Sequence, residues 1–188
     1  KKIVKASLNQ KLILYVGRID PVKGIDVLLY TIKILVQKHP LPLISLWIVG
    51  GGSKELKRLE EIRQLLKITA YVKFIGKKPR ERLPYYYNAA EVVLMPSQYE
   101  SFGQAALEAM ACGTPIIVTD VTGVSGLLDS EHSSLLISAN NPIGLAKKIR
   151  HLLMNKNEHR KMSQEVFKKV RNLSWENVAD KFTQIVSK

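Results

Sequence analysis

The sequence predicts an α/β fold: a doubly wound, Rossmann-like, mostly parallel sheet of six strands, with helices on both faces and a helical tail at the carboxyl end. Short runs rich in Val and Ile alternate with longer amphipathic segments, as buried parallel strands alternate with helices. The 188 residues suffice for one domain with its own core. A composition of 46% hydrophobic and 24% charged residues is ordinary for a folded domain.

The elements follow one another in a regular order along the chain. Strands are predicted at residues 12–16, 43–49, 72–75, 92–95, 116–118 and 135–137. Helices are predicted between them at residues 25–37, 54–66, 81–88 and 104–110. Strand signals then stop, and the tail is predicted as helices 142–154, 158–170 and 174–186. Residues 121–134 are the least periodic stretch, and their Gly, Ser and Asp content indicates a loop.

The first strand runs into a turn that carries two cations. Gly17 permits a tight turn, and Arg18 and Lys23 follow it. Ligands of doubly wound sheets bind at the carboxyl ends of strands, so both cations are directed toward the expected site. Arg offers a planar fork of donors and Lys a mobile point charge, a pairing that suits a diphosphate. The plainer alternative is a turn with two solvated bases.

The second strand ends in a triple glycine that leads into a helix. Gly50 opens this segment, where the backbone can approach a ligand closely. The pattern is not G-x-G-x-x-G, and a dinucleotide-dependent oxidoreductase would carry that fingerprint at the first strand. An ordinary glycine turn between strand and helix is the alternative.

The stretch after the fourth strand holds two carboxylates. Glu100 lies in a loop, and Glu108 lies about two turns inside the following helix, so the two can reach different parts of one elongated ligand. The amides of Phe102 and Gly103 sit at the amino end of this helix, where unpaired N–H groups attract phosphate. Ordinary charges on an exposed helix face are the alternative.

Five segments, taken in order, resemble one known family. They are GRIDPVKG, IVGGG, FIGKKPRERLPYYYNAAEVVLMPS, ESFGQAALEAMACGTPIIVTD and LSWENVADKF. Together they are similar to the carboxy-terminal domain of group 1 (family 4) retaining glycosyltransferases of the GT-B fold, and the resemblance covers nearly the whole chain. It implies that residues 1–188 form a single nucleotide-sugar-binding domain, whose amino-terminal acceptor domain lies outside this sequence.

The resemblance also implies roles for individual residues. Arg18 and Lys23 would bind the donor diphosphate and stabilise the charge of the leaving group, and Glu100 would contact hydroxyls of the transferred sugar. These three form the expected catalytic set, while Glu108 would hold the ribose hydroxyls. The expected donor-binding set is Gly17, Arg18, Lys23, Gly50, Gly76, Lys77, Glu100, Ser101, Phe102, Gly103 and Glu108.

The chain departs from the family pattern after the fifth strand. The family usually has Gly-Gly-x-x-Glu there, whereas this chain reads TGVSGLL with Gly126 in place of the Glu. Further on, His132 and Ser133 stand where the family often has Asn-Gly. We therefore leave residues 122–133 out of the predicted site.

The composition excludes several other classes. Cys112 is the only cysteine, so a disulfide scaffold or a Cys-rich zinc site does not fit, and a reducing cytoplasm is expected. The four histidines show no metal-ligand spacing, and no metal or other cofactor is expected. Tyr85, Tyr86 and Tyr87 are consecutive, point in different directions on a helix and are predicted to be packing residues.

The predicted function is transfer of a sugar from a UDP, GDP or ADP sugar to an acceptor hydroxyl, with retention and without metal. It would require the acceptor domain, in cis or as a separate subunit, and the chain alone is expected to be inactive. The net charge of +13 leaves a peripheral contact at the inner membrane face open. No nucleic acid is expected as partner, although a nucleic-acid-binding module and a non-catalytic regulatory domain are the rival hypotheses.

Overall fold

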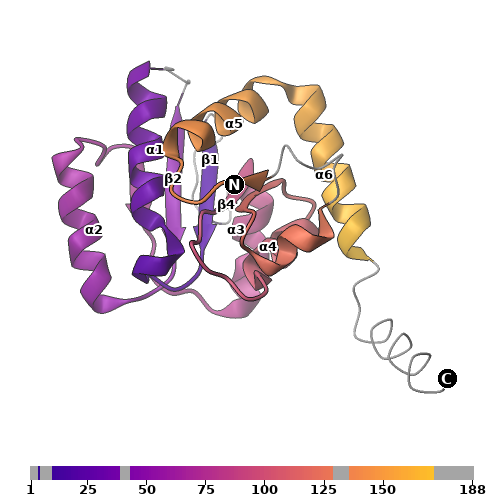
Figure 1. Ribbon diagram of the computed structural model, residues 1–188, viewed down its shortest axis with the longest axis horizontal. Helices are drawn as coiled ribbons and strands as arrows, with labels where there is room; N and C mark the ends of the chain where they lie inside the picture. The colour runs from indigo at the N-terminus through magenta and orange to yellow at the C-terminus, as the bar shows by residue number, and fades with distance from the viewer. Residues whose placement is uncertain (1–3, 5–9, 39–42, 129–135, 172–188) are drawn as a thin grey trace.

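The computed structural model describes residues 4, 10–38, 43–128 and 136–171 of the chain. Its centre is a six-stranded sheet in the order β3-β2-β1-β4-β5-β6, and every strand pair is parallel (Figure 1). The strands are β1 (Lys11–Val16), β2 (Ile44–Val49), β3 (Val72–Phe74), β4 (Val92–Met95), β5 (Ile116–Thr119) and β6 (Leu136–Ile137). The predicted fold class and all six predicted strands are confirmed.

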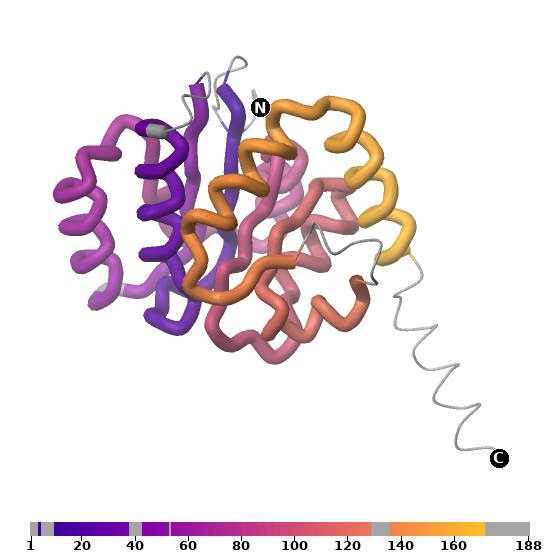
Figure 2. The backbone as a smooth tube through the Cα atoms, turned by 45° about the horizontal axis from the view of Figure 1, so that its top comes forward, coloured from indigo at the N-terminus to yellow at the C-terminus, as the bar shows by residue number. Residues whose placement is uncertain are grey.

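Helices cover both faces of this sheet. The α-helices are α1 (Ile25–Lys38), α2 (Ser53–Leu65), α3 (Leu83–Ala89), α4 (Gln104–Ala111), α5 (Pro142–Met154) and α6 (Lys156–Arg171). One layer is formed by α1 with α2 and α5 packed beside it. In the other, α3 packs against α4, which also contacts α6 (Figure 2). The chain thus winds around the sheet in both directions, as a doubly wound fold requires.

The core lies where the central strands are covered on both sides. All six residues of β2 and all four of β4 are buried. Because both faces are covered, these strands read as continuous apolar runs rather than as an alternating pattern. The few buried polar side chains include Ser45, which accepts a hydrogen bond from the Trp47 indole N–H at 3.1 Å.

Some element boundaries differ from those predicted. The third helix is preceded by a 3₁₀ turn, η2 (Arg80–Arg82), and α3 starts at Leu83, because Pro84 favours the first turn of a helix. The predicted loop after β5 contains a 3₁₀ helix, η3 (Gly123–Leu127), in which the Ser125 amide donates to the Thr122 carbonyl at 2.9 Å and the Ser125 hydroxyl donates to the same carbonyl. The last predicted helix, residues 174–186, lies outside the described residues.

The strand order reverses direction between β1 and β4. Successive strands build outward from β1 through β2 to β3, and the chain then returns to place β4 on the other side of β1. Loops that leave neighbouring strands in opposite directions open a crevice at their carboxyl ends, where such folds bind ligands. The segments carrying Arg18 and Glu100 follow β1 and β4 and therefore meet there.

Among the described helices, none combines the length and the apolar character that crossing a bilayer would need.

Candidate functional site

A cavity of about 550 Å³ opens at the carboxyl ends of β1 and β4. Its wall is formed by Tyr15, Val16, Gly17, Arg18, Lys23, Arg80, Leu83, Met95, Ser97, Glu100, Ser101, Phe102, Gln104, Ala105 and Glu108. The two cations and two acids singled out in the sequence are all members of this wall. The structure thus brings these four residues to one cavity, while their roles in donor binding stay predictions.

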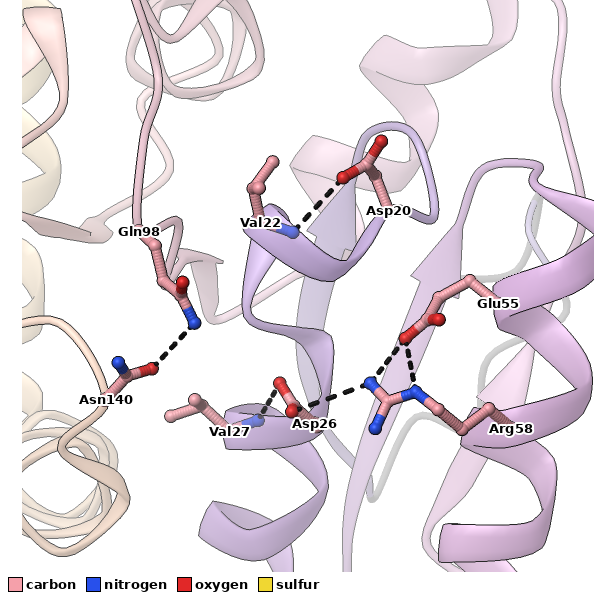
Figure 3. Close-up of polar contacts among 8 residues, drawn as sticks. All are labelled: Asp20, Val22, Asp26, Val27, Glu55, Arg58, Gln98 and Asn140. Atoms are coloured by element: carbon pink, nitrogen blue, oxygen red, sulfur yellow. Dashed lines mark hydrogen bonds and ion pairs between the residues drawn. The ribbon is translucent and has the colours of Figure 1, made fainter.

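The turn after β1 is held by its own short-range hydrogen bonds. The buried Tyr15 hydroxyl donates to the Arg18 carbonyl at 2.8 Å, and a Cβ on Gly17 would lie 2.8 Å from that same hydroxyl. Asp20 caps the 3₁₀ turn η1 (Pro21–Lys23) by accepting from the Val22 amide at 3.1 Å (Figure 3). The turn thereby presents an exposed Arg18 and a half-buried Lys23 to one cavity.

Gly24 ends this turn in the left-handed region at φ 64°, which favours glycine. A Cβ at Gly24 would lie 2.2 Å from the Pro96 carbonyl oxygen, so the turn can pack closely against the segment after β4. The Gln98 amide also donates to the Val22 carbonyl at 2.8 Å. The two segments that carry Lys23 and Glu100 are therefore joined through their backbones.

Lys23 and Glu100 form an ion pair within the cavity. The Lys23 Nζ lies 2.6 Å from the Glu100 Oε2, and both side chains are largely buried. The Glu100 carboxylate also accepts hydrogen bonds from the amides of Phe102 and Gly103, at the amino end of α4. In this structure the amides that the sequence assigned to phosphate thus hold a carboxylate.

These contacts decide the charge of Glu100. Burial by itself would raise the pKa of this carboxyl group. The hydrogen bond and charge of Lys23, with the amides of Phe102 and Gly103, outweigh burial and lower the pKa of Glu100 below its ordinary value. Glu100 is therefore an anion at neutral pH, able to accept hydrogen bonds from hydroxyl groups.

The loop after β5 supports the same segment. The Gly123 amide donates to the Glu100 carbonyl at 3.1 Å, and Thr122 pairs with Glu100 in an isolated β-bridge. A Cβ on Gly123 would lie 2.2 Å from the Ser101 carbonyl oxygen. The part of residues 122–133 that the structure describes thus braces the backbone of Glu100, a role that the sequence reasoning did not assign.

Glu108 is held at the other end of the cavity. The Tyr87 hydroxyl, from α3, donates to the Glu108 Oε2 at 2.8 Å. The Arg80 guanidinium, from η2, lies 3.6 Å from the Glu108 Oε1. Tyr87 is buried as predicted, but its hydroxyl also links α3 to the Glu108 carboxylate.

Contacts outside the cavity fix the surrounding elements (Figure 3). Arg58 of α2 contacts Glu55 on its own helix and Asp26 of α1, the latter at 3.6 Å. The Gln98 side-chain amide donates to the Asn140 side-chain oxygen at 3.1 Å, which joins the Glu100 loop to the segment before α5.

Four residues of the predicted donor-binding set lie outside the cavity wall. Gly50 follows β2, and Gly76 and Lys77 follow β3. Both strands lie on the side of β1 that is opposite β4. A Cβ on Gly50 would lie 1.8 Å from the Gly17 carbonyl oxygen, so its close backbone approach is to the neighbouring turn. Gly103 also falls outside the wall, although its amide holds Glu100. Their roles in donor binding stay predictions.

The structure adds three polar groups that the sequence reasoning missed, two in the cavity wall and one, Tyr87, that reaches the site through Glu108. Arg80 and Tyr87 lie in the segment before α4, and no local pattern distinguishes them from ordinary helix residues. Ser97 is fully buried in the cavity wall, and its hydroxyl has no hydrogen-bond partner among the described residues. Such a hydroxyl is suited to a ligand, since buried polar groups are normally paired.

The remaining ionisable groups show no metal cluster. Within the described ranges, no three His, Cys, Asp or Glu side chains gather as metal ligands would. His151 pairs with Glu158, and the His159 Nε2 lies 2.7 Å from the Glu91 carbonyl oxygen. Cys112 is half-buried rather than buried, and burial raises the pKa of its thiol, so it is a weak nucleophile.

Comparison with known proteins gives one consistent result. A family model described as glycosyl transferases group 1 matches residues 1–169. D-inositol 3-phosphate glycosyltransferase of Corynebacterium urealyticum is 35% identical over 182 residues, which cover 95% of this chain and 43% of the relative. The corresponding enzyme of Corynebacterium jeikeium is 34% identical over 174 residues, or 90% and 42% of the two chains.

Solved structures agree with this result. Sucrose-phosphate synthase from Thermosynechococcus elongatus superposes with a TM-score of 0.86 at 32% identity, covering 99% of this chain and 47% of that one. Anabaena HepE, in complex with UDP and glucose, has a TM-score of 0.83 at 19% identity and shares the fold over 95% of this chain and 48% of its own. The chain thus spans less than half the length of these relatives.

Proposed function

Because the chain belongs to the group 1 glycosyltransferases, we propose that its cavity binds a nucleoside-diphosphate sugar and serves transfer of that sugar to an acceptor hydroxyl. The observation that carries the proposal is the convergence of Arg18, Lys23, Glu100 and Glu108 on one cavity. Cations for a diphosphate and acids for hydroxyl groups are the two kinds of partner that such a donor needs. Anabaena HepE, which has this fold, contains UDP and glucose in its structure.

Arg18 and Lys23 would act on the diphosphate. As the bond between sugar and diphosphate breaks, negative charge grows on the leaving oxygen, and fixed cations there lower the barrier. Lys23 has three N–H donors, so it can keep its contact with Glu100 while it binds a phosphate oxygen. The ion pair would then place the leaving group beside the sugar.

Glu100 and Glu108 would hold hydroxyl groups. Glu100, ionised and paired with Lys23, would accept hydrogen bonds from the transferred sugar, and Glu108 would accept them from the ribose. Both would orient the donor rather than attack it. Retention of configuration and independence from metal remain part of this proposal, carried by the family resemblance.

The binding site for the acceptor would lie outside this sequence. Since the chain covers 43% of the inositol-phosphate glycosyltransferase that it matches, the acceptor would bind a second domain, in cis or as a subunit. A cytoplasmic location at the inner face of a membrane stays a prediction.

Calorimetry with UDP, GDP and ADP sugars tests donor binding. We expect one nucleotide series to bind and the Lys23→Ala and Glu108→Ala variants to bind it at least about tenfold more weakly, because each removes a charge-assisted contact worth about 1.5 to 3 kcal/mol. Lys54→Ala, an exposed lysine on α2, is the matched control and should bind as the unaltered chain does.

Absence of binding by every nucleotide and nucleotide sugar at millimolar concentration would contradict the proposal. A steep loss of affinity for a nucleic acid with rising salt, without any preference for a nucleotide sugar, would support the nucleic-acid rival instead.

A further inference from the structure

We infer that Tyr87 is a positioning residue that gives this site its preference for ribose over deoxyribose, acting through Glu108. The inference rests on the proposed function, in which Glu108 receives the ribose hydroxyls. Tyr87 does not belong to the cavity wall, so it acts on the nucleotide only through the carboxylate that it contacts.

The geometry fixes Glu108 from one side. The Tyr87 hydroxyl donates to the Glu108 Oε2 at 2.8 Å, while among the described residues the contact of the Oε1 is the Arg80 guanidinium, 3.6 Å away. Arg80 is highly exposed and its side chain is long, so it holds the carboxylate weakly. The tyrosine therefore sets the plane of the carboxylate.

Tyr87 is itself rigid. The residue is 1% exposed, and the buried Thr114 hydroxyl donates to the Tyr87 carbonyl at 2.9 Å, which ties α3 to the segment after α4. Burial, followed by the hydrogen bond to Glu108, raises the pKa of Tyr87, so its hydroxyl stays protonated and remains a donor. A donor fixed in this way restrains the orientation of the Glu108 carboxylate, whose side chain is 30% exposed.

Recognition of a vicinal diol depends on this orientation. A carboxylate accepts from two neighbouring hydroxyls when its plane faces both of them, and each of its oxygens has two lone pairs. The Oε2 can thus accept from Tyr87 and from one ribose hydroxyl at once. If Tyr87 did not hold the carboxylate, ordering Glu108 would cost free energy when the nucleotide binds. The gain in affinity from the second ribose hydroxyl would then be smaller.

The test compares Tyr87→Phe with the unaltered chain in calorimetry, with two probes. The first probe is the nucleoside diphosphate that binds best among UDP, GDP and ADP, and the second is its 2′-deoxy analogue. We expect Tyr87→Phe to bind the ribonucleotide about tenfold more weakly, the order of one hydrogen bond to a charged group. Binding of the deoxy analogue should change much less, so the ribose-to-deoxyribose ratio should fall.

Two further variants separate positioning from general damage. Tyr85→Phe alters an exposed tyrosine on the same helix and should leave the ratio unchanged. In a Glu108→Gln background, Tyr87→Phe should have a much smaller effect on the ratio, since both act on one contact. An unchanged ratio in Tyr87→Phe, or an equal loss for both probes, overturns the inference.

The inference and the proposed function fail separately. If the unaltered chain binds no nucleotide, the proposed function fails, whereas binding with an insensitive ratio overturns only the role of Tyr87. Should Tyr87→Phe not fold, a crystal structure of the unaltered chain with the diphosphate decides. Ribose hydroxyls bonded to a Glu108 that still accepts from Tyr87 support the inference, and any other partner for these hydroxyls overturns it.

Discussion

At the scale of single residues, the site depends on an ion pair between Lys23 and Glu100. Lys23 and Glu100 lie far apart along the chain, yet their charged atoms approach to 2.6 Å. An exposed pair of this kind would contribute little, because water screens it and side-chain entropy opposes it. Here both groups are mostly buried, and the backbone amides of Phe102 and Gly103 complete the coordination of the carboxylate.

The lowered pKa of Glu100 predicts how stability depends on pH. Glu100 releases its proton more readily in the folded chain than in the unfolded chain, where its pKa is about 4.3. Its stabilising contribution is therefore complete above that pH and is lost as the pH falls through the folded-state pKa. We expect Glu100→Gln to lower the free energy of unfolding at pH 7, and the difference to shrink below about pH 4.

Urea unfolding followed by circular dichroism between pH 7 and about pH 3 measures this difference. Glu61→Gln, at an exposed position of α2, serves as control and should change stability little across this range. A difference between Glu100→Gln and the unaltered chain that stays constant down to acid pH would contradict the assignment.

At the scale of elements, the glycines after β2 differ in what they do. Gly50 packs against the backbone of the turn after β1, where its absent Cβ would lie 1.8 Å from the Gly17 carbonyl oxygen. The neighbouring Gly51 is open, since a Cβ there would meet only the Lys77 Cβ at 3.8 Å. The segment after β2 thus packs against the turn after β1 through Gly50, whereas Gly51 is not needed for this close backbone contact.

Alanine substitution separates these two glycines. Gly50→Ala must displace backbone and is expected to lower the free energy of unfolding by about 1 to 3 kcal/mol or more, as other overpacked sites do. Gly51→Ala should be neutral or slightly stabilising, because it mainly reduces the entropy of the unfolded chain. Thermal and urea unfolding of both variants measure the contrast, and equal effects would show that the approach at Gly50 is not tight.

At the scale of the whole molecule, the sheet order places the site at the carboxyl ends of the two central strands. The return of the chain from β3 to β4 brings two turns together at the carboxyl ends of β1 and β4. The cavity between them is a groove on one domain, and the chain covers less than half of the relatives that it resembles. We propose that the other half supplies the second wall.

This arrangement predicts binding without turnover. The chain alone should bind a nucleotide sugar but transfer no sugar at a measurable rate, because positioning an acceptor can supply about 7 to 11 kcal/mol of the barrier and we propose that a second domain does this. Turnover is measured as release of nucleoside diphosphate, which is monitored by chromatography in reactions that contain candidate acceptors. Sustained release by the chain alone would contradict the prediction.

The sequence by itself determined the fold class, the six strands and the four charged residues that meet in the cavity. Hydrophobic periodicity carries the fold, because a strand buried on both faces must be a continuous apolar run. The carboxyl-end rule for parallel sheets then predicts that Arg18 and Glu100 approach one another, since each lies in the segment after a strand. Local pattern was a weaker guide after β5, where the predicted loop contains a 3₁₀ helix.

Only the tertiary structure decided which groups pair within the site. The contact of Lys23 with Glu100 and that of Tyr87 with Glu108 join segments separated by 77 and 21 residues, and no local pattern encodes such distances. The structure also placed Gly50, Gly76 and Lys77 outside the cavity wall, in the segments after β2 and β3, which lie on the side of β1 opposite β4. Periodicity reports which side of an element is buried, whereas side-chain pairing depends on how elements from distant parts of the chain pack together.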